Sequence, residues 1–215
     1  MSSASKSLSD AFRRHGMLSA IDDHVVEHAI EHEQQPVTIR QQFSQQMLRH
    51  VMINNLRKAS GKEVCLHGPL LGQHAQTITN WISAFENLRQ YLPAATIFAR
   101  EVKRVALGEP EKTEDAAWRG DGLMFLATKG AGYETRHMLN GLIHEIGHAY
   151  ADSVGFVDSV PALYGQQPFV NDYAAKDPHE DFAETFLFYH VDPGLLNRVA
   201  KPKYLDMHKR MVKVA

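Results

Sequence analysis

The chain has 215 residues, of which 44% are hydrophobic, 22% charged and 9% aromatic, a composition typical of a globular protein able to bury a core. A formal net charge of −2 gives no reason to expect nucleic acid or a membrane as partner, and no apolar run is long enough to cross a bilayer. The single cysteine, Cys65, excludes an internal disulfide, and the polar N-terminus lacks a signal-peptide core. We therefore expect a cytoplasmic protein, or one exported without a cleaved signal peptide.

Residues 1–92 are expected to form a helical N-terminal region. Apolar residues recur there at helical spacing in three stretches, which predict helices over residues 9–33, 38–60 and 75–91. Pro93 is expected to end the last of these helices, since proline cannot continue a helix interior. Residues 62–73, which contain two glycines and a proline, are predicted to be a loop.

The first predicted helix carries the pattern H-x-x-E-H twice, and its histidines His24, His28 and His32 share one helix face. Such a stripe could hold a metal ion. We favour a solvated face of an amphipathic helix, because no strand precedes the pattern and no carboxylate motif follows it at a suitable place.

Residues 93–215 are expected to form a second domain that mixes strands with helices. The predicted elements are a strand or a helix over residues 97–107, a turn-rich connection over 108–122, a strand over 123–128, and helices over 135–154 and 178–189. The expected fold class is therefore α+β and predominantly helical, with a small sheet and an active-site helix.

The helix over residues 135–154 contains the pattern H-E-x-x-H, formed by His144, Glu145 and His148. Residues four apart on a helix lie on one face, so both imidazoles can aim at one point, as two ligands of a tetrahedral zinc ion do. Glu145 is placed to accept a proton from a water at the open position of the metal. The opposite face of the helix is apolar, with residues Leu139, Leu142, Ile143, Ile146 and Ala149. The alternative is that two unrelated surface histidines fall at this spacing by chance.

A third protein ligand is expected from the helix over residues 178–189, which Asp177 is placed to cap. Glu180 and Glu184 share one face of it, and we assign Glu180 as the ligand. Glu184 then accepts the N–H of a ligating histidine and fixes its tautomer. The alternatives are a capping-box role for Glu180 and an exposed position for Glu184. Asp152 is a further candidate to support a ligand, or else an exposed residue near a helix end.

The segments H-E-I-G-H-A-Y-A-D and E-D-F-A-E, with Tyr173 seven residues before Glu180, carry a resemblance to a known family. The chain resembles the gluzincin-type zinc metallopeptidases grouped with anthrax toxin lethal factor and the clostridial Pro-Pro endopeptidases. The match covers about residues 97–190. The resemblance implies a zincin-like domain, Zn²⁺ as cofactor and the following roles: His144, His148 and Glu180 as zinc ligands, Glu145 as base, and Tyr173 as the hydroxyl that stabilises the oxyanion.

These motifs predict a zinc-dependent metalloendopeptidase that hydrolyses peptide bonds through a zinc-bound water activated by Glu145, with a protein or peptide as substrate. Tyr164 is a rival to Tyr173 for the oxyanion role. The strand over residues 123–128 is expected to bind an extended substrate along its edge. The alternative function is a non-catalytic zinc-binding module whose residues 1–92 dock a protein partner.

Overall fold

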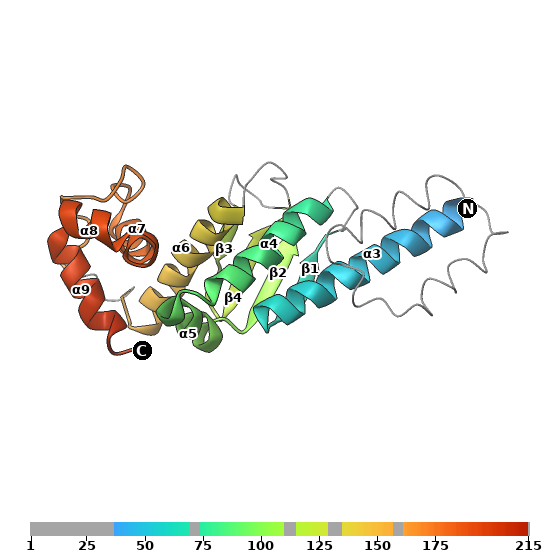
Figure 1. Ribbon diagram of the computed structural model, residues 1–215, viewed down its shortest axis with the longest axis horizontal. Helices are drawn as coiled ribbons and strands as arrows, with labels where there is room; N and C mark the ends of the chain where they lie inside the picture. The colour runs from blue at the N-terminus through green and yellow to red at the C-terminus, as the bar shows by residue number, and fades with distance from the viewer. Residues whose placement is uncertain (1–36, 69–73, 110–114, 129–134, 157–160, 215) are drawn as a thin grey trace. The chain divides into compact units, whose positions relative to one another are not determined.

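The computed structural model describes residues 37–68, 74–109, 115–128, 135–156 and 161–214 (Figure 1). The chain divides into two compact units, Met1–Val51 and Met52–Ala215. Helix α3 (Val37–Ser60) begins in the first unit and ends in the second. It confirms the helix predicted over residues 38–60. The predicted helix over residues 9–33 and the stripe of His24, His28 and His32 lie outside the described residues.

The second unit contains a mixed four-stranded sheet. Its strands are β1 (Glu63–His67), β2 (Arg104–Gly108), β3 (Ala116–Trp118) and β4 (Leu123–Ala127), in the order β1-β2-β4-β3. Strands β1, β2 and β4 run parallel, and β3 pairs antiparallel with β4. The strand predicted over residues 123–128 is confirmed. The loop predicted over residues 62–73 is wrong over β1, and the turn-rich connection over 108–122 contains β3.

Strand β4 does not offer an edge for substrate. It lies between β2 and β3, and its register with both neighbours runs over most of its length. The prediction that a substrate adds to residues 123–128 is therefore wrong, because both edges of that strand are already hydrogen-bonded. Among the described strands, β3 forms the edge of the sheet beyond β4. It also contacts the helix that carries the H-E-x-x-H pattern.

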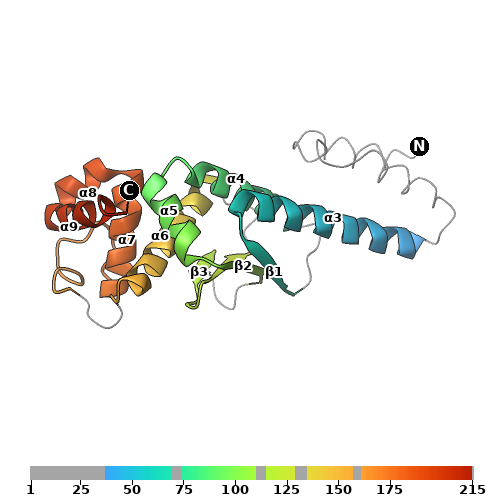
Figure 2. The same ribbon diagram turned by 90° about the horizontal axis from the view of Figure 1, so that it is seen from below.

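Helices α4 (Ala75–Leu88), α5 (Leu92–Glu101) and α6 (Thr135–Ser153) lie on one side of the sheet, as Figure 2 shows. Pro93 lies in the first turn of α5, where its missing N–H needs no partner, so it begins a helix rather than ending one. The region over residues 97–107 therefore divides into the end of α5 and strand β2. Helix α4 packs on α6, so segments before and after residue 93 belong to one compact unit.

Helix α7 (Pro178–Val191) packs on α6 and carries the second half of the predicted site. Its N-cap is Asp177, as expected, and the Asp177 side chain accepts hydrogen bonds from the backbone N–H groups of His179 and Glu180. Phe182 and Phe186 are fully buried. Their burial fixes the rotation of α7 about its axis and so turns the face with Glu180 and Glu184 towards α6.

Helices α8 (Pro193–Val199) and α9 (Lys201–Met211) pack against α7 (Figure 1). Lys203 of α9 is almost fully buried, and its ammonium forms a 2.6 Å ion pair with the buried carboxylate of Asp181 on α7. The described part of the chain is thus α+β and helix-rich with a small mixed sheet, which confirms the predicted fold class at this level. Among the described helices, none has the length and apolar character needed to cross a membrane.

Candidate metal centre

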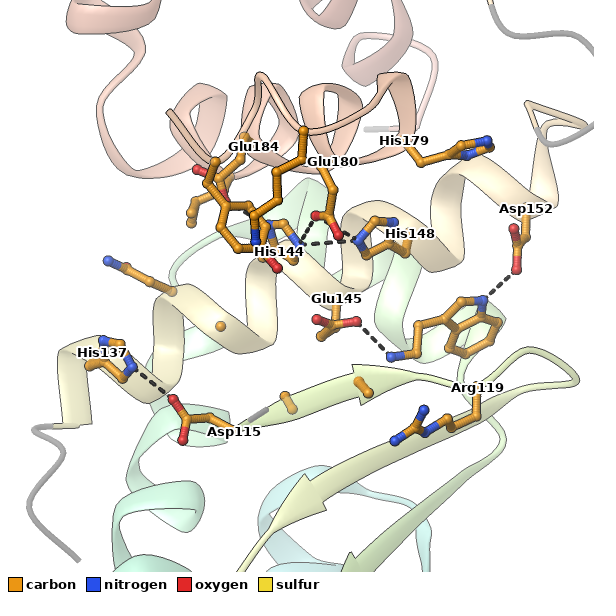
Figure 3. Close-up of a pocket in the computed structure, with 18 residues that line it drawn as sticks. Asp115, Arg119, His137, His144, Glu145, His148, Asp152, His179, Glu180 and Glu184 are labelled. Carbon is orange, nitrogen blue, oxygen red and sulfur yellow. Dashed lines mark hydrogen bonds and ion pairs between the residues drawn. The ribbon is translucent and has the colours of Figure 1, made fainter. Parts of the chain in front are cut away.

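Helix α6 presents His144, Glu145 and His148 to a cleft of about 910 Å³ (Figure 3). The opposite face of the helix is buried: Leu142, Ile143 and Ile146 have no exposed surface. This apolar face fixes the rotation of the helix, so the two imidazoles point together towards α7. His144 itself is only 7% exposed, which is low for a residue that can carry charge.

Three ring and carboxylate atoms converge above α6. His144 Nε2 lies 3.1 Å from His148 Nε2 and 3.0 Å from Glu180 Oε2, and His148 Nε2 lies 3.5 Å from the same Glu180 oxygen. Ligands about 2.0–2.1 Å from a tetrahedral zinc ion are separated from one another by roughly 3.3–3.4 Å. The three observed separations lie close to that value, so the donor set has the size of a zinc site.

The surroundings of the Glu180 carboxylate give a second test of whether the site suits a cation. Glu180 Oε2 is buried and has no partner with hydrogen-bond geometry within the described part of the chain. A buried carboxylate oxygen without a hydrogen bond is unfavourable unless a cation balances it. The backbone N–H of Glu180 bonds to Asp177, whereas its carboxylate faces the imidazoles, so this side chain is not the reciprocal partner of a capping box.

Glu184 holds the first histidine in place. Its Oε1 atom lies 2.7 Å from His144 Nδ1, and Glu184 is only 6% exposed, which rules out the alternative of an exposed helix residue. A carboxylate accepting the Nδ1–H of an imidazole leaves the lone pair on Nε2, the atom that faces His148 and Glu180. The predicted supporting role of Glu184 therefore matches its position.

The charges of this cluster are strongly coupled. Burial alone would lower the pKa of His144, but the adjacent carboxylates of Glu180 and Glu184 raise it to about 10. Burial alone would raise the pKa of Glu180, but the two imidazoles hold it well below its usual range. Without a metal, the site therefore stabilises a proton at the position where a cation would be bound.

Glu145 projects from the same helix towards the sheet rather than towards α7 (Figure 3). Its Oε2 atom accepts a 2.6 Å hydrogen bond from the backbone N–H of Trp118 in β3. Donor atoms of His144, Glu145 and His148 all lie within 4.8 Å of one another. Burial raises the pKa of Glu145, while the two imidazoles oppose that shift. A carboxylate with a raised pKa is a stronger proton acceptor, as a general base requires.

Tyr173 borders the same cleft. Its ring centroid lies 5.6 Å from that of His144, and the residue lines the cleft and is 44% exposed. The ammonium of Lys176 lies 3.5 Å from the centre of the Tyr173 ring, in a cation–π contact. The rival Tyr164 is buried, and its hydroxyl donates to Asp206 at 2.9 Å, which leaves it no route to the cleft.

The remaining predicted residue, Asp152, does not touch a histidine ligand. Its carboxylate accepts a hydrogen bond from the indole N–H of Trp118, at the far end of the cleft (Figure 3). His137 and Asp115 form a 2.9 Å pair at the opposite end. Asp152 thus fixes the Trp118 side chain, whose backbone N–H holds Glu145, rather than supporting a metal ligand directly.

Sequence reasoning missed several residues at or beside this cleft, among them Asp115, Trp118, Asn171 and Lys176. Asp115 and Trp118 belong to a segment that was predicted to be a connection of turns, and Asn171 and Lys176 lie in the loop before α7. None of them stands in a spacing that marks a chemical role. The Asn171 side chain donates a 2.6 Å hydrogen bond to Glu184.

The chain matches no protein-family model, and no curated protein matches it in sequence.

Proposed function

We propose that the protein is a zinc-dependent metalloendopeptidase with a zincin-like catalytic domain. The convergence of His144 Nε2, His148 Nε2 and Glu180 Oε2 within 3.0–3.5 Å of one another carries the proposal, because this donor set leaves one position of a tetrahedral ion open. Closed structural zinc sites use four protein ligands, whereas three ligands with an open position are typical of catalytic sites.

Bound zinc would lower the pKa of a water molecule towards about 7 and polarise the carbonyl of the scissile peptide bond. Glu145 accepts the proton of the attacking water and passes it to the leaving amine. The Trp118 N–H holds one oxygen of the Glu145 carboxylate and thereby orients the other. Glu184 keeps the His144 Nε2 lone pair directed at the metal position.

Tyr173 supplies a hydroxyl donor beside the ligand set. Its accessible side chain borders the cleft next to His144, so it can donate to the oxyanion that develops on the substrate carbonyl. Lys176, held over the Tyr173 ring, restricts the orientation of that ring.

The edge of β3 is the proposed binding place for an extended peptide. Backbone groups of Arg119 and Asp115 bond to β4, so by alternation those of Ala116 and Trp118 point to the open edge of β3, away from β4. The Trp118 N–H is already bonded to Glu145, so a peptide backbone can pair with the Ala116 N–H and C=O and with the Trp118 C=O, without strong demands on its side chains. The chain also lacks the G-x-M-E-N segment with which aminopeptidases bind a substrate amine, which favours an endopeptidase.

The test compares Glu145→Gln with the parent on a proteome-derived peptide library with added zinc. The glutamine variant should lose roughly 10²–10⁴ of the cleavage rate and keep its zinc. Glu86→Gln, at an exposed glutamate of α4, is the matched control and should cleave like the parent. Equal cleavage by Glu145→Gln would refute the catalytic assignment. Bound zinc in a parent that cleaves no peptide would favour the non-catalytic module instead.

A further inference from the structure

The loop before α7 contains a half-buried asparagine that touches both parts of the site. Asn171 Nδ2 donates to Glu184 Oε2 at 2.6 Å, and Asn171 Oδ1 accepts from the backbone N–H of Ala174 at 2.9 Å. The first bond reaches the carboxylate behind a metal ligand. The second closes a turn around Tyr173, which lies between the two bonded residues in sequence.

The two bonds use both ends of one rigid amide. An asparagine side chain offers two N–H donors and a carbonyl acceptor at fixed angles, so satisfying both partners determines the orientation of the amide plane. Glu184 in turn has each oxygen occupied, Oε1 by His144 Nδ1 and Oε2 by Asn171 Nδ2. A buried carboxylate fixed at both oxygens cannot rotate, and the imidazole that it holds is fixed with it.

The Asn171–Ala174 turn is also secured at its far end. Ala174 has no exposed surface, so the backbone that follows Tyr173 is packed against the core. Upstream, the ammonium of Lys203 donates to the backbone carbonyls of Gln166 and Pro168 at 2.7 and 2.8 Å. Asn171 lies between these two anchors and is the point at which the loop is tied to the metal centre.

We propose that Asn171 is a positioning residue that couples the orientation of His144, through Glu184, to the placement of Tyr173. This inference rests on the proposed zinc centre, and it assigns Asn171 no direct contact with metal or substrate. Supporting groups behind a metal ligand typically change metal affinity or activity by roughly 10–100-fold when they are removed.

Two substitutions separate the two bonds. Asn171→Asp keeps an oxygen for the Ala174 N–H but places a carboxylate against Glu184, whereas Asn171→Ala removes both bonds. Asn171→Asp should raise the zinc dissociation constant, measured by competition with a chelator, about 10–100-fold. Asn197→Asp, at an exposed asparagine of α8, makes the same charge change as a control and should bind zinc like the parent.

A double-mutant cycle tests whether Asn171 acts through Glu184. Asn171→Ala should weaken zinc binding in the parent and cause little further loss in a Glu184→Gln background, because residues in one hydrogen-bond network are not additive. Additive losses, or an Asn171→Asp variant within twofold of the parent, would overturn the inference. Far-UV circular dichroism of each full-length variant verifies that it is folded.

Zinc affinity is measured without substrate, so the peptidase function and the role of Asn171 can be refuted independently of each other. A parent that binds zinc, responds to Asn171→Asp as predicted and hydrolyses nothing would refute the peptidase and keep the role of Asn171. If the parent hydrolyses peptides and Asn171→Asp binds zinc normally, the peptidase function stands and the role of Asn171 is refuted. The absorption spectrum of the cobalt-loaded protein gives an independent readout: Asn171→Asp should alter it, and an unchanged spectrum would count against the inference.

Discussion

Gly147 of α6 lies directly against Ala183 of α7, so a Cβ atom at residue 147 would stand only 3.0 Å from Ala183 Cα and 3.2 Å from Phe186 Cβ. Backbone atoms cannot move aside as a flexible side chain can, so α6 and α7 would have to separate. The two helices carry the three proposed metal ligands between them. The close approach at Gly147 therefore sets the distance over which His144, His148 and Glu180 converge.

Gly147→Ala should destabilise the protein by about 1–3 kcal/mol, the usual effect of overpacking, and should also weaken zinc binding. Urea unfolding measures the first effect and chelator competition the second. Gly141→Ala is the matched control for stability, since a Cβ there meets nothing within 4 Å. That variant should gain about 0.5–1 kcal/mol from helix propensity. Equal changes in the two variants would show that the helices are not in close contact.

Lys203→Met should lower the free energy of unfolding by about 3–5 kcal/mol, because it leaves the buried Asp181 carboxylate without its cation. The double variant Lys203→Met/Asp181→Asn should recover part of this loss, since the charge is then removed as well. Urea denaturation of both proteins measures the difference. A single variant as stable as the parent would show that the pair is solvated in solution.

The metal-free protein should lose stability as the pH rises. The folded-state pKa of His144, about 10, lies above its unfolded value of 6.5, so its contribution is fully present below pH 6.5 and is lost as the pH rises through 10. His144→Ala should flatten this dependence. Thermal or urea unfolding of chelator-treated protein over pH 6–10 measures it, and identical slopes for parent and variant would contradict the coupling.

Zinc binding should depend on pH in the opposite direction. Because metal ligation displaces the proton held at His144, the apparent zinc affinity should rise about tenfold per pH unit between pH 6 and 8. Calorimetry in buffers of different ionisation enthalpy should detect about one proton released per zinc ion from this residue. An affinity independent of pH would mean that His144 is neutral before the metal binds.

Tyr173→Phe should lower kcat by roughly 10²–10³ while zinc content and stability stay close to those of the parent, because the residue is 44% exposed and the substitution keeps its ring. Tyr164→Phe should give the reverse pattern. It removes a buried hydrogen bond to Asp206 and should cost about 1–3 kcal/mol of stability, with little effect on kcat of the folded fraction. If both variants have the same kcat as the parent, neither tyrosine stabilises the oxyanion.

The helices were predictable where the apolar residues follow the helix period over several turns, as in residues 135–154 and 178–189. Strand β1 was not predictable, because polar residues at both its ends, Glu63 and His67, and the glycine that follows are typical of a loop sequence. Strand β3 has three residues, too few to show any period. The sequence could not decide the role of Pro93, because proline can follow the end of one helix or occupy the first turn of the next.

The candidate site was predictable to the extent that local spacing determines it. His144 and His148 share a helix face through a four-residue interval, and Glu180 and Glu184 do the same. Trp118 and Asn171 could not be found in this way, because their bonds to Glu145 and Glu184 span 27 and 13 residues of sequence. No periodicity links such pairs, since the packing of β3 and of the loop before α7 creates them.

The most direct test of the metal centre is an anomalous difference map recorded at the zinc absorption edge from crystals of the full chain grown with zinc. We expect one strong peak about 2.0–2.2 Å from His144 Nε2, His148 Nε2 and a Glu180 carboxylate oxygen. A peak elsewhere, or none beside these three atoms, would contradict the proposed centre and the peptidase built upon it.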